Sequence, residues 1–89
     1  MVHSLQLTFG STGVLQMPVA PTKFASALIV SSSAAGSRMG DSTTSSSKGL
    51  PLPVATPVAV SVSPSRIILS AYHFYGASAT VIDILYEDV

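Results

Sequence analysis

The sequence predicts an all-β protein, built as a small antiparallel β-sandwich or jelly roll. Apolar and polar residues alternate with a period of two in several short segments, and turn-forming residues separate those segments. The chain of 89 residues makes a single domain, residues 1–89, near the lower size limit for a core without disulfides or metals. We therefore expect contacts with partners to add stability.

The first third of the chain predicts three strands. Apolar side chains alternate with polar ones from Ser4 to Phe9, which indicates a half-buried strand, and Gly10 to Gly13 has the composition of a turn. The alternation resumes from Leu15 to Val19, but Pro18 cannot donate to a ladder, so this segment is predicted as an edge strand or a bulge. Lys23 to Ser31 has apolar residues on both faces, so we expect a central strand that is covered on both sides.

A Ser- and Thr-rich segment, residues 31–48, follows this strand. Its hydroxyls compete with ladder hydrogen bonds by pairing locally with the backbone, and a flexible linker is one interpretation. However, Gly36 and Gly40-Asp41 supply turn chemistry at set places, and Met39 supplies an apolar anchor. We therefore predict a hairpin excursion of the β domain.

The second half contains one clear strand and one ambiguous segment. Val58 to Val62 alternates with small residues and is the most regular strand pattern in the chain. Residues 64–75 could form a helix that is capped by Ser63. This helix would give a C-terminal βαβ unit after a disordered N-terminal half. Alternatively, Arg66 to Tyr75 is a strand that forms a hairpin with Thr80 to Tyr86. The β pattern elsewhere favours the hairpin.

The charge content argues against two classes of partner. Charged residues make up 9% of the chain and the net charge is zero, whereas roughly 25% is usual for a soluble domain. The basic residues are too scattered for a nucleic-acid footprint, which needs clustered Lys and Arg. No apolar run approaches the roughly 18 residues of a membrane-spanning helix. We expect neither a nucleic-acid partner nor a membrane partner.

The N-terminal composition supports a competing hypothesis. The first basic side chain apart from His3 is Lys23, which argues against a secretory signal, but residues 1–40 contain no Asp or Glu and are rich in Ser, Thr and Ala. This composition is typical of a plastid transit peptide. The alternative is therefore an organelle-targeted or truncated chain with a transit-like N-terminal region and a C-terminal βαβ fragment.

The chain has no pattern that indicates catalysis. Cysteine is absent, so a disulfide framework, a thiolate ligand and a thiol nucleophile are all excluded. His3 and His73 lie on separate predicted strands without a third ligand at a recognisable spacing, so we predict no metal site. A Ser-His-Asp set carries no information in so serine-rich a chain. We expect no catalytic residue, no cofactor and no enzymatic activity.

We predict that the segment from Arg38 to Gly49 forms a backbone turn. Gly40 is expected to take a positive φ, and Asp41 is expected to accept backbone N–H bonds, with Arg38 beside it. Lys48-Gly49 would supply a second turn at the far end. We assign this segment no ligand.

Aromatic side chains are concentrated near the C-terminus. We expect Phe74 and Tyr86 to fill the core. Tyr72 and Tyr75 are candidates for an intersubunit contact, because tyrosine is favoured where one end of the side chain is apolar and the other is wet.

The order of these segments resembles small structural proteins of tailed bacteriophages. The resemblance rests on Arg38-Met39-Gly40-Asp41-Ser42, on the Ser/Thr stretch that ends in Lys48-Gly49-Leu50-Pro51-Leu52, and on a closing strand that ends in Leu85-Tyr86. Residues Pro53 to Pro57 depart from it, because a more polar, glycine-bearing turn would be expected there. The resemblance implies a non-enzymatic virion protein that decorates or cements a capsid or forms a head fibre. Its implied partners are further copies of itself and a major capsid or other virion protein.

Overall fold

The computed structural model describes residues 2–20, 22–61 and 67–88, and these ranges form a small antiparallel β-sandwich. Short strands connected by turns make up most of it. In chain order the elements are β1 (Val2–Thr8), β2 (Gly13–Gln16), β3 (Phe24–Ser32), β4 (Arg38–Gly40), β5 (Leu50–Pro51), β6 (Val58–Ser61), β7 (Ile67–Ile68), the 3₁₀ turn η1 (Leu69–Ala71), β8 (His73–Gly76) and β9 (Val81–Asp88).

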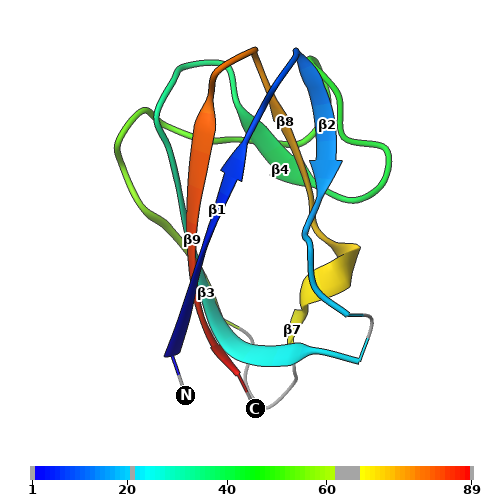
Figure 1. The fold of residues 1–89 in the computed structure, drawn as a ribbon, viewed down its shortest axis with the longest axis vertical. Coiled ribbons are helices and arrows are strands. Elements are labelled where there is room, and N and C mark those ends of the chain that lie inside the picture. Colours follow the sequence, from blue (N-terminus) through cyan, green and yellow to red (C-terminus); the bar gives the residue numbers. More distant parts are fainter. Residues whose placement is uncertain (1, 21, 62–66, 89) are drawn as a thin grey trace.

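The described strands are divided between two sheets. Sheet A has the order β1-β9-β3-β6, with β7 also paired to β3, and sheet B has the order β2-β8-β4-β5. Every pairing between these strands is antiparallel. Figure 1 shows β1 and β9 side by side, with both ends of the chain at the same end of the sandwich. The predicted fold class is confirmed.

Strand β9 lies at the centre of sheet A, between β1 and β3. Its side chains alternate strictly: Ile82, Ile84 and Tyr86 are buried, while Asp83 and Leu85 are exposed. A slip of one residue in register would move the apolar set to the outside, so this alternation fixes the pairing on both sides of the strand. Burying each large apolar side chain contributes roughly 1.5–3 kcal/mol.

The core lies between the sheets and is continuous. Strand side chains from both sheets meet there with residues from the connecting segments, which close the open ends of the sandwich. Its buried apolar members are Leu7, Phe9, Met17, Ala25, Leu28, Val30, Met39, Leu52, Ile67, Leu69, Phe74, Ile82, Ile84 and Tyr86. Phe74 and Tyr86 thus occupy the core, as the sequence predicted.

Strand β3 pairs with β9 on one side and with β6 and β7 on the other, as expected for a central strand. A register shift between Ala25 and Ala27 places Ala25, Leu28 and Val30 on the buried face. The expectation that both faces are covered is wrong, because Ile29 is 38% exposed. The described chain supplies one layer against β3, and the other face stays open.

The predicted edge strand is present as β2, which pairs with β8 alone among the described strands. The strand ends at Gln16, before Pro18. The Met17 amide still donates to the Tyr72 carbonyl at 2.9 Å. Proline therefore ends the ladder where the missing N–H requires it to end.

The predicted hairpin between Arg66–Tyr75 and Thr80–Tyr86 is wrong. Strand β8 belongs to sheet B, where it pairs with β2 and β4, whereas β9 belongs to sheet A. The turn after Gly76 therefore carries the chain from one sheet to the other. Strand propensity located β8 and β9, but η1 interrupts the strand predicted over Arg66–Tyr75, and adjacency in sequence does not determine which sheet a strand joins.

The alternative fold is not observed in the described ranges. Residues 2–20 and 22–48 form strands and hydrogen-bonded turns instead of a disordered region. Where a crossover helix was considered, Ile67–Ile68 is a strand, Leu69–Ala71 a single 3₁₀ turn and His73–Gly76 a strand. The proposed helix cap, Ser63, lies outside the described residues.

The crossover between β8 and β9 is fastened to Phe9. Ala79 adopts a φ of 70° and donates its N–H to the Phe9 carbonyl at 2.7 Å, while the Phe9 N–H donates to the Thr80 carbonyl at 2.9 Å. The Phe9 ring packs directly on Gly76, where an added Cβ would lie 2.9 Å from ring carbon Cε1. Glycine is needed at this position for space.

Gly76→Ala is expected to destabilise the fold by about 1–3 kcal/mol, because the methyl group overpacks the Phe9 ring. Gly13, the direct partner of Gly76 across β2 and β8, is a matched control, since a Cβ there meets nothing within 4 Å. Urea unfolding of both variants measures the effect. Equal stability of Gly76→Ala and Gly13→Ala would contradict this packing argument.

Candidate functional site

The loop after β4 is organised by its own side chains. The Asp41 carboxylate oxygen Oδ1 accepts the Thr43 N–H at 2.8 Å and the Thr43 hydroxyl at 2.5 Å. The buried Thr44 hydroxyl donates to the Asp41 carbonyl at 2.6 Å. The Ser45 N–H donates to the Lys48 carbonyl at 2.9 Å and so closes the far end of the loop. Asp41 accepts a backbone N–H bond, as the sequence predicted.

Two glycines in this loop differ from their predicted roles. Gly40 does not have the expected positive φ; it is required because a Cβ would lie 2.6 Å from the Thr44 hydroxyl. Gly49 has a φ of 126°, and its Cβ would meet the Met39 carbonyl oxygen at 3.1 Å. The loop therefore depends on glycine twice, once for space and once for conformation.

Arg38 lies on β4, opposite Pro51 of β5 and Tyr75 of β8. Its Nη1 donates to the Gly49 carbonyl at 2.8 Å, which ties the start of the loop to its end. Arg38, Gly40, Asp41 and Gly49 are thus brought together by the β4–β5 pairing. Since their hydrogen bonds are directed within the loop, the arrangement is that of a backbone turn.

Hydrogen bonds from Thr43 lower the pKa of Asp41 below its ordinary value of 3.8, the hydroxyl bond having the larger effect. Nearby Lys48 and His73 act in the same direction, while partial desolvation opposes them. Because the folded-state pKa is depressed, the ionised carboxylate stabilises the fold above the unfolded-state pKa. This contribution is lost as the pH falls through the lower folded-state pKa.

The two candidate interface tyrosines lie in different environments. Tyr72 follows η1, is half-buried and packs against the core cluster. Tyr75 is on the outward side of β8, because its neighbours Phe74 and Gly76 are buried. It lies between Val14 of β2 and Arg38 of β4 in the sheet. Tyr75 therefore remains available for an external contact, whereas Tyr72 is largely engaged within the chain.

The histidines belong to different sheets. The His3 ring stacks on the Tyr86 ring in sheet A, with centroids 5.1 Å apart. His73 lies on β8 of sheet B, near the Ala71 carbonyl. Among the described residues, no three His, Cys, Asp or Glu side chains are grouped in a way that could hold a metal ion.

A second surface, the outer face of sheet A, is more open. Cross-strand pairs place Ser4, Leu85, Ile29 and Ala59 in one row across four strands. The neighbouring row contains Gln6, Asp83 and Ser31, and a further row contains Val2, Glu87 and Ala27. Apolar side chains thus run through the centre of the face, and polar ones flank them.

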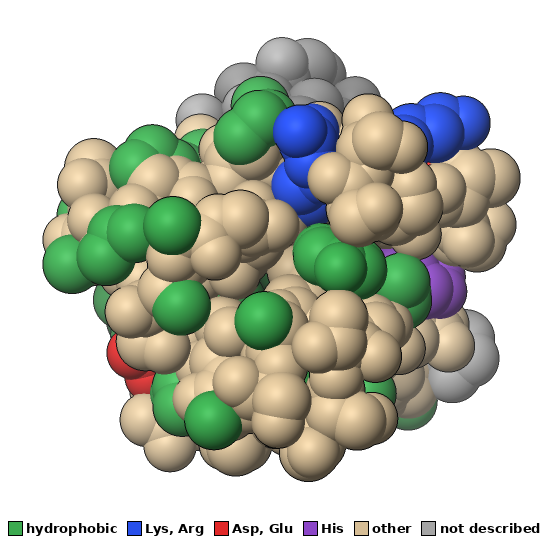
Figure 2. Space-filling model, turned by 90° about the horizontal axis from the view of Figure 1, so that it is seen from above, with side chains coloured by type: hydrophobic (Ala, Val, Ile, Leu, Met, Phe, Trp, Pro, Cys, Tyr) green, Lys and Arg blue, Asp and Glu red, His purple; other side chains and the backbone are tan. Residues whose placement is uncertain are grey.

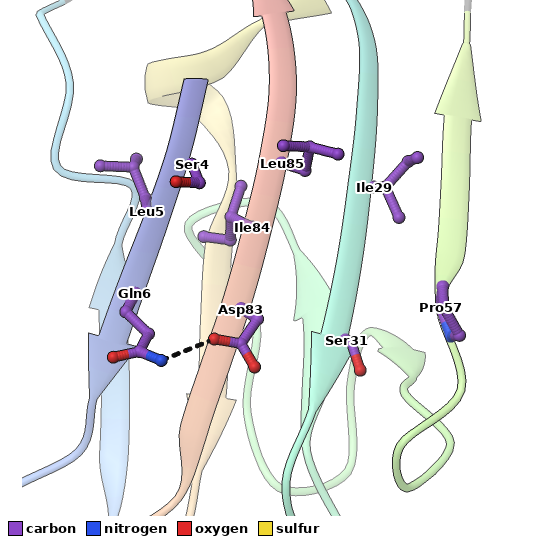
Figure 3. Close-up of a pocket in the computed structure, with 9 residues that line it drawn as sticks. All are labelled: Ser4, Leu5, Gln6, Ile29, Ser31, Pro57, Asp83, Ile84 and Leu85. Atoms are coloured by element: carbon purple, nitrogen blue, oxygen red, sulfur yellow. Dashed lines mark hydrogen bonds between the residues drawn. The ribbon is translucent and has the colours of Figure 1, made fainter. Parts of the chain in front are cut away.

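This face is hollowed into a groove of about 450 Å³. Figure 3 shows Leu85 and Ile29 side by side at its centre, with Pro57 beyond Ile29. On the other side the Gln6 amide donates to the Asp83 carboxylate at 2.9 Å. A smaller hollow of about 150 Å³ shares Ile29 and Leu85 and extends toward Val2. Together they form a continuous apolar strip along the sheet.

Three large apolar side chains of this strip are exposed to solvent. Val2 is 57% exposed and Leu85 is 41% exposed, in addition to Ile29. Sequence reasoning missed the strip, because the apolar residues on both sides of Lys23–Ser31 were interpreted as burial within one chain. The sequence did contain one indication of the strip. Leu85 is an apolar residue between Asp83 and Glu87 on the outward side of the last strand.

No family model, curated protein or solved structure matches this chain. In the ranges that the structure describes, no helix is long and apolar enough to cross a membrane. The outer face of sheet A, defined by Ile29, Leu85 and their neighbours, is the candidate site because it carries the exposed apolar strip and the groove.

Thr43→Val should raise the pKa of Asp41 toward its ordinary value, because it removes the hydroxyl donor and keeps the backbone N–H. Carboxyl ¹³C NMR over an acid titration measures it. Thr56→Val is the matched control, since the Thr56 hydroxyl donates to the Val54 carbonyl instead. Identical Asp41 pKa values in Thr43→Val and the wild type would refute the assigned cause.

Proposed function

We propose that this protein is a non-enzymatic virion structural subunit. It acts by self-association and by binding the capsid shell, as a decoration, cement or head-fibre protein. The observation that carries the proposal is the apolar strip on the outer face of sheet A, formed by Val2, Ile29 and Leu85. Contiguous exposed apolar surface with a polar rim is typical of protein interfaces.

The composition supports the same function. A chain with 9% charged residues and 47% hydrophobic residues has more apolar surface than a thin sandwich can bury. Covering the strip with another protein removes this surface from water and adds stability to the folded state. The similarity of the Arg38–Leu52 segment to phage structural proteins makes a virion the expected setting.

The loop from Arg38 to Gly49 has a supporting role in this proposal. Its hydrogen bonds hold β4 and β5 together and so maintain the edge of sheet B. A rigid sandwich presents its outer faces without an ordering cost on binding, which favours assembly from small contact areas.

Leu85→Ser should weaken self-association by about tenfold or more, because it removes the centre of the apolar strip and leaves the core intact. Sedimentation velocity over a concentration series measures this. Val54→Ser is the control, since Val54 is 49% exposed but lies in the segment between β5 and β6. If Leu85→Ser associates as well as Val54→Ser does, the strip is not the assembly surface.

The virion setting has its own test. Mass spectrometry of purified particles from the source of this chain should find it at a stoichiometric copy number. Its absence from such particles would overturn the virion role, even if the protein self-associates in solution.

A further inference from the structure

The charged residues on the described strands differ in sign between the sheets, while Lys23 lies directly before β3 and Asp41 directly after β4. Within the described residues, the strands of sheet A include Asp83 and Glu87 on the outer face and contain no Lys or Arg. The described strands of sheet B include Arg38 and contain no Asp or Glu. Figure 2 shows the blue and purple side chains toward the top and right of the molecule and the red ones at the left. The two outer faces therefore differ in charge.

The outer face of sheet B combines this positive charge with an apolar part. Val14, Tyr75 and Arg38 form one row across β2, β8 and β4, and Val14 is 42% exposed. Lys48 and His73 lie near Asp41 at the end of β4. Asp41 is the acid of this region, and its hydrogen bonds from Thr43 favour the ionised carboxylate. Arg38 and Lys48 together outweigh this negative charge, so the face has an apolar row next to an end of net positive charge.

A symmetric pairing of two sheet A faces would be unfavourable. A two-fold interface sets a patch against itself, so Asp83 and Glu87 of one copy would approach the same acids of the other. Like charges brought together at an interface oppose association. The apolar strip favours burial, but its charged rim opposes burial against an identical strip.

We propose that the outer face of sheet A docks onto the outer face of sheet B of a second copy. The apolar strip around Leu85 then covers Val14 and Tyr75, and Asp83 and Glu87 lie toward Arg38 and Lys48. This inference rests on the proposed function, since it identifies the partner surface for the self-association proposed above.

This contact is heterologous, because the two copies use different surfaces. The two sheets present opposite sides of the sandwich, so every copy uses both faces at once. Repetition of such a contact gives a closed ring or an extended fibre, depending on the rotation between copies. Both products suit a protein that acts in many copies on a shell.

Charge reversal separates this contact from the symmetric alternative. The double variant Asp83→Lys/Glu87→Lys should by itself weaken association by about tenfold or more. It sets positive charge against Arg38 and Lys48. Lys48→Glu alone should weaken it in the same direction. Mixing the two variants should restore association, since the unchanged sheet A of the Lys48→Glu variant then meets the unchanged sheet B of the double variant. Light scattering at low ionic strength measures all three, and added salt should reduce the differences.

A symmetric contact gives the opposite pattern. The double Lys variant would then associate better with the wild type than the wild type does with itself, and Lys48→Glu would have no effect. That result would overturn the heterologous contact and leave the proposed self-association intact. Unchanged association in every charge variant would overturn it too and would point to pairing of strand edges. A wild type that stays monomeric at all concentrations would overturn both proposals.

Two controls keep the experiment interpretable. Asp83→Asn removes the charge but retains an oxygen for the Gln6 amide, so it tests charge with the least structural change. Ser11→Lys adds a positive charge to the exposed turn between β1 and β2, on neither outer face, and should leave association unchanged. Weakening by Ser11→Lys equal to that by Asp83→Asn would show that net charge alone is responsible and would overturn the proposal.

Discussion

The alternation of side chains along β9 is the constraint on which the rest of the structure depends. This strand is paired on both sides, and it directs Ile82, Ile84 and Tyr86 into the core. The register of β1 and β3 follows from it, because any slip would exchange the two faces. When sheet B covers the inward side chains of β9, the residues that point outward are determined as well. Leu85 then lies on the surface between two acids.

The same constraint connects the fold to the proposed function. The described strands form two layers, and none of them lies over the outer face of sheet A. The apolar residues that β3 directs outward, Ile29 above all, thus remain without a covering layer in the described chain. In the proposed function, assembly supplies that layer from another molecule. Fold stability and association are then two aspects of one requirement, the removal of apolar surface from water.

Much of the fold was predictable from local patterns. The strand alternations in β1, β6 and β9 and the end of β2 before Pro18 each have a direct local cause. The sheet to which each strand belongs was not predictable, because the β8 and β9 patterns fit a hairpin as well as a crossover. The role of Gly40 was missed because it depends on Thr44, which lies close to it only in the folded loop. The outer strip was missed for a related reason: sequence shows that both faces of β3 are apolar but not whether the covering layer comes from the same molecule.

The most direct test of the account is surface labelling of the wild-type protein with a photoactivated carbene at low and high concentration, read by mass spectrometry. If the outer face of sheet A is the assembly surface, labelling of Ile29 and Leu85 falls as the protein assembles, while labelling of Val54, which is exposed elsewhere, does not change. Assembled protein in which Ile29 and Leu85 are labelled as strongly as in the dilute protein would contradict it.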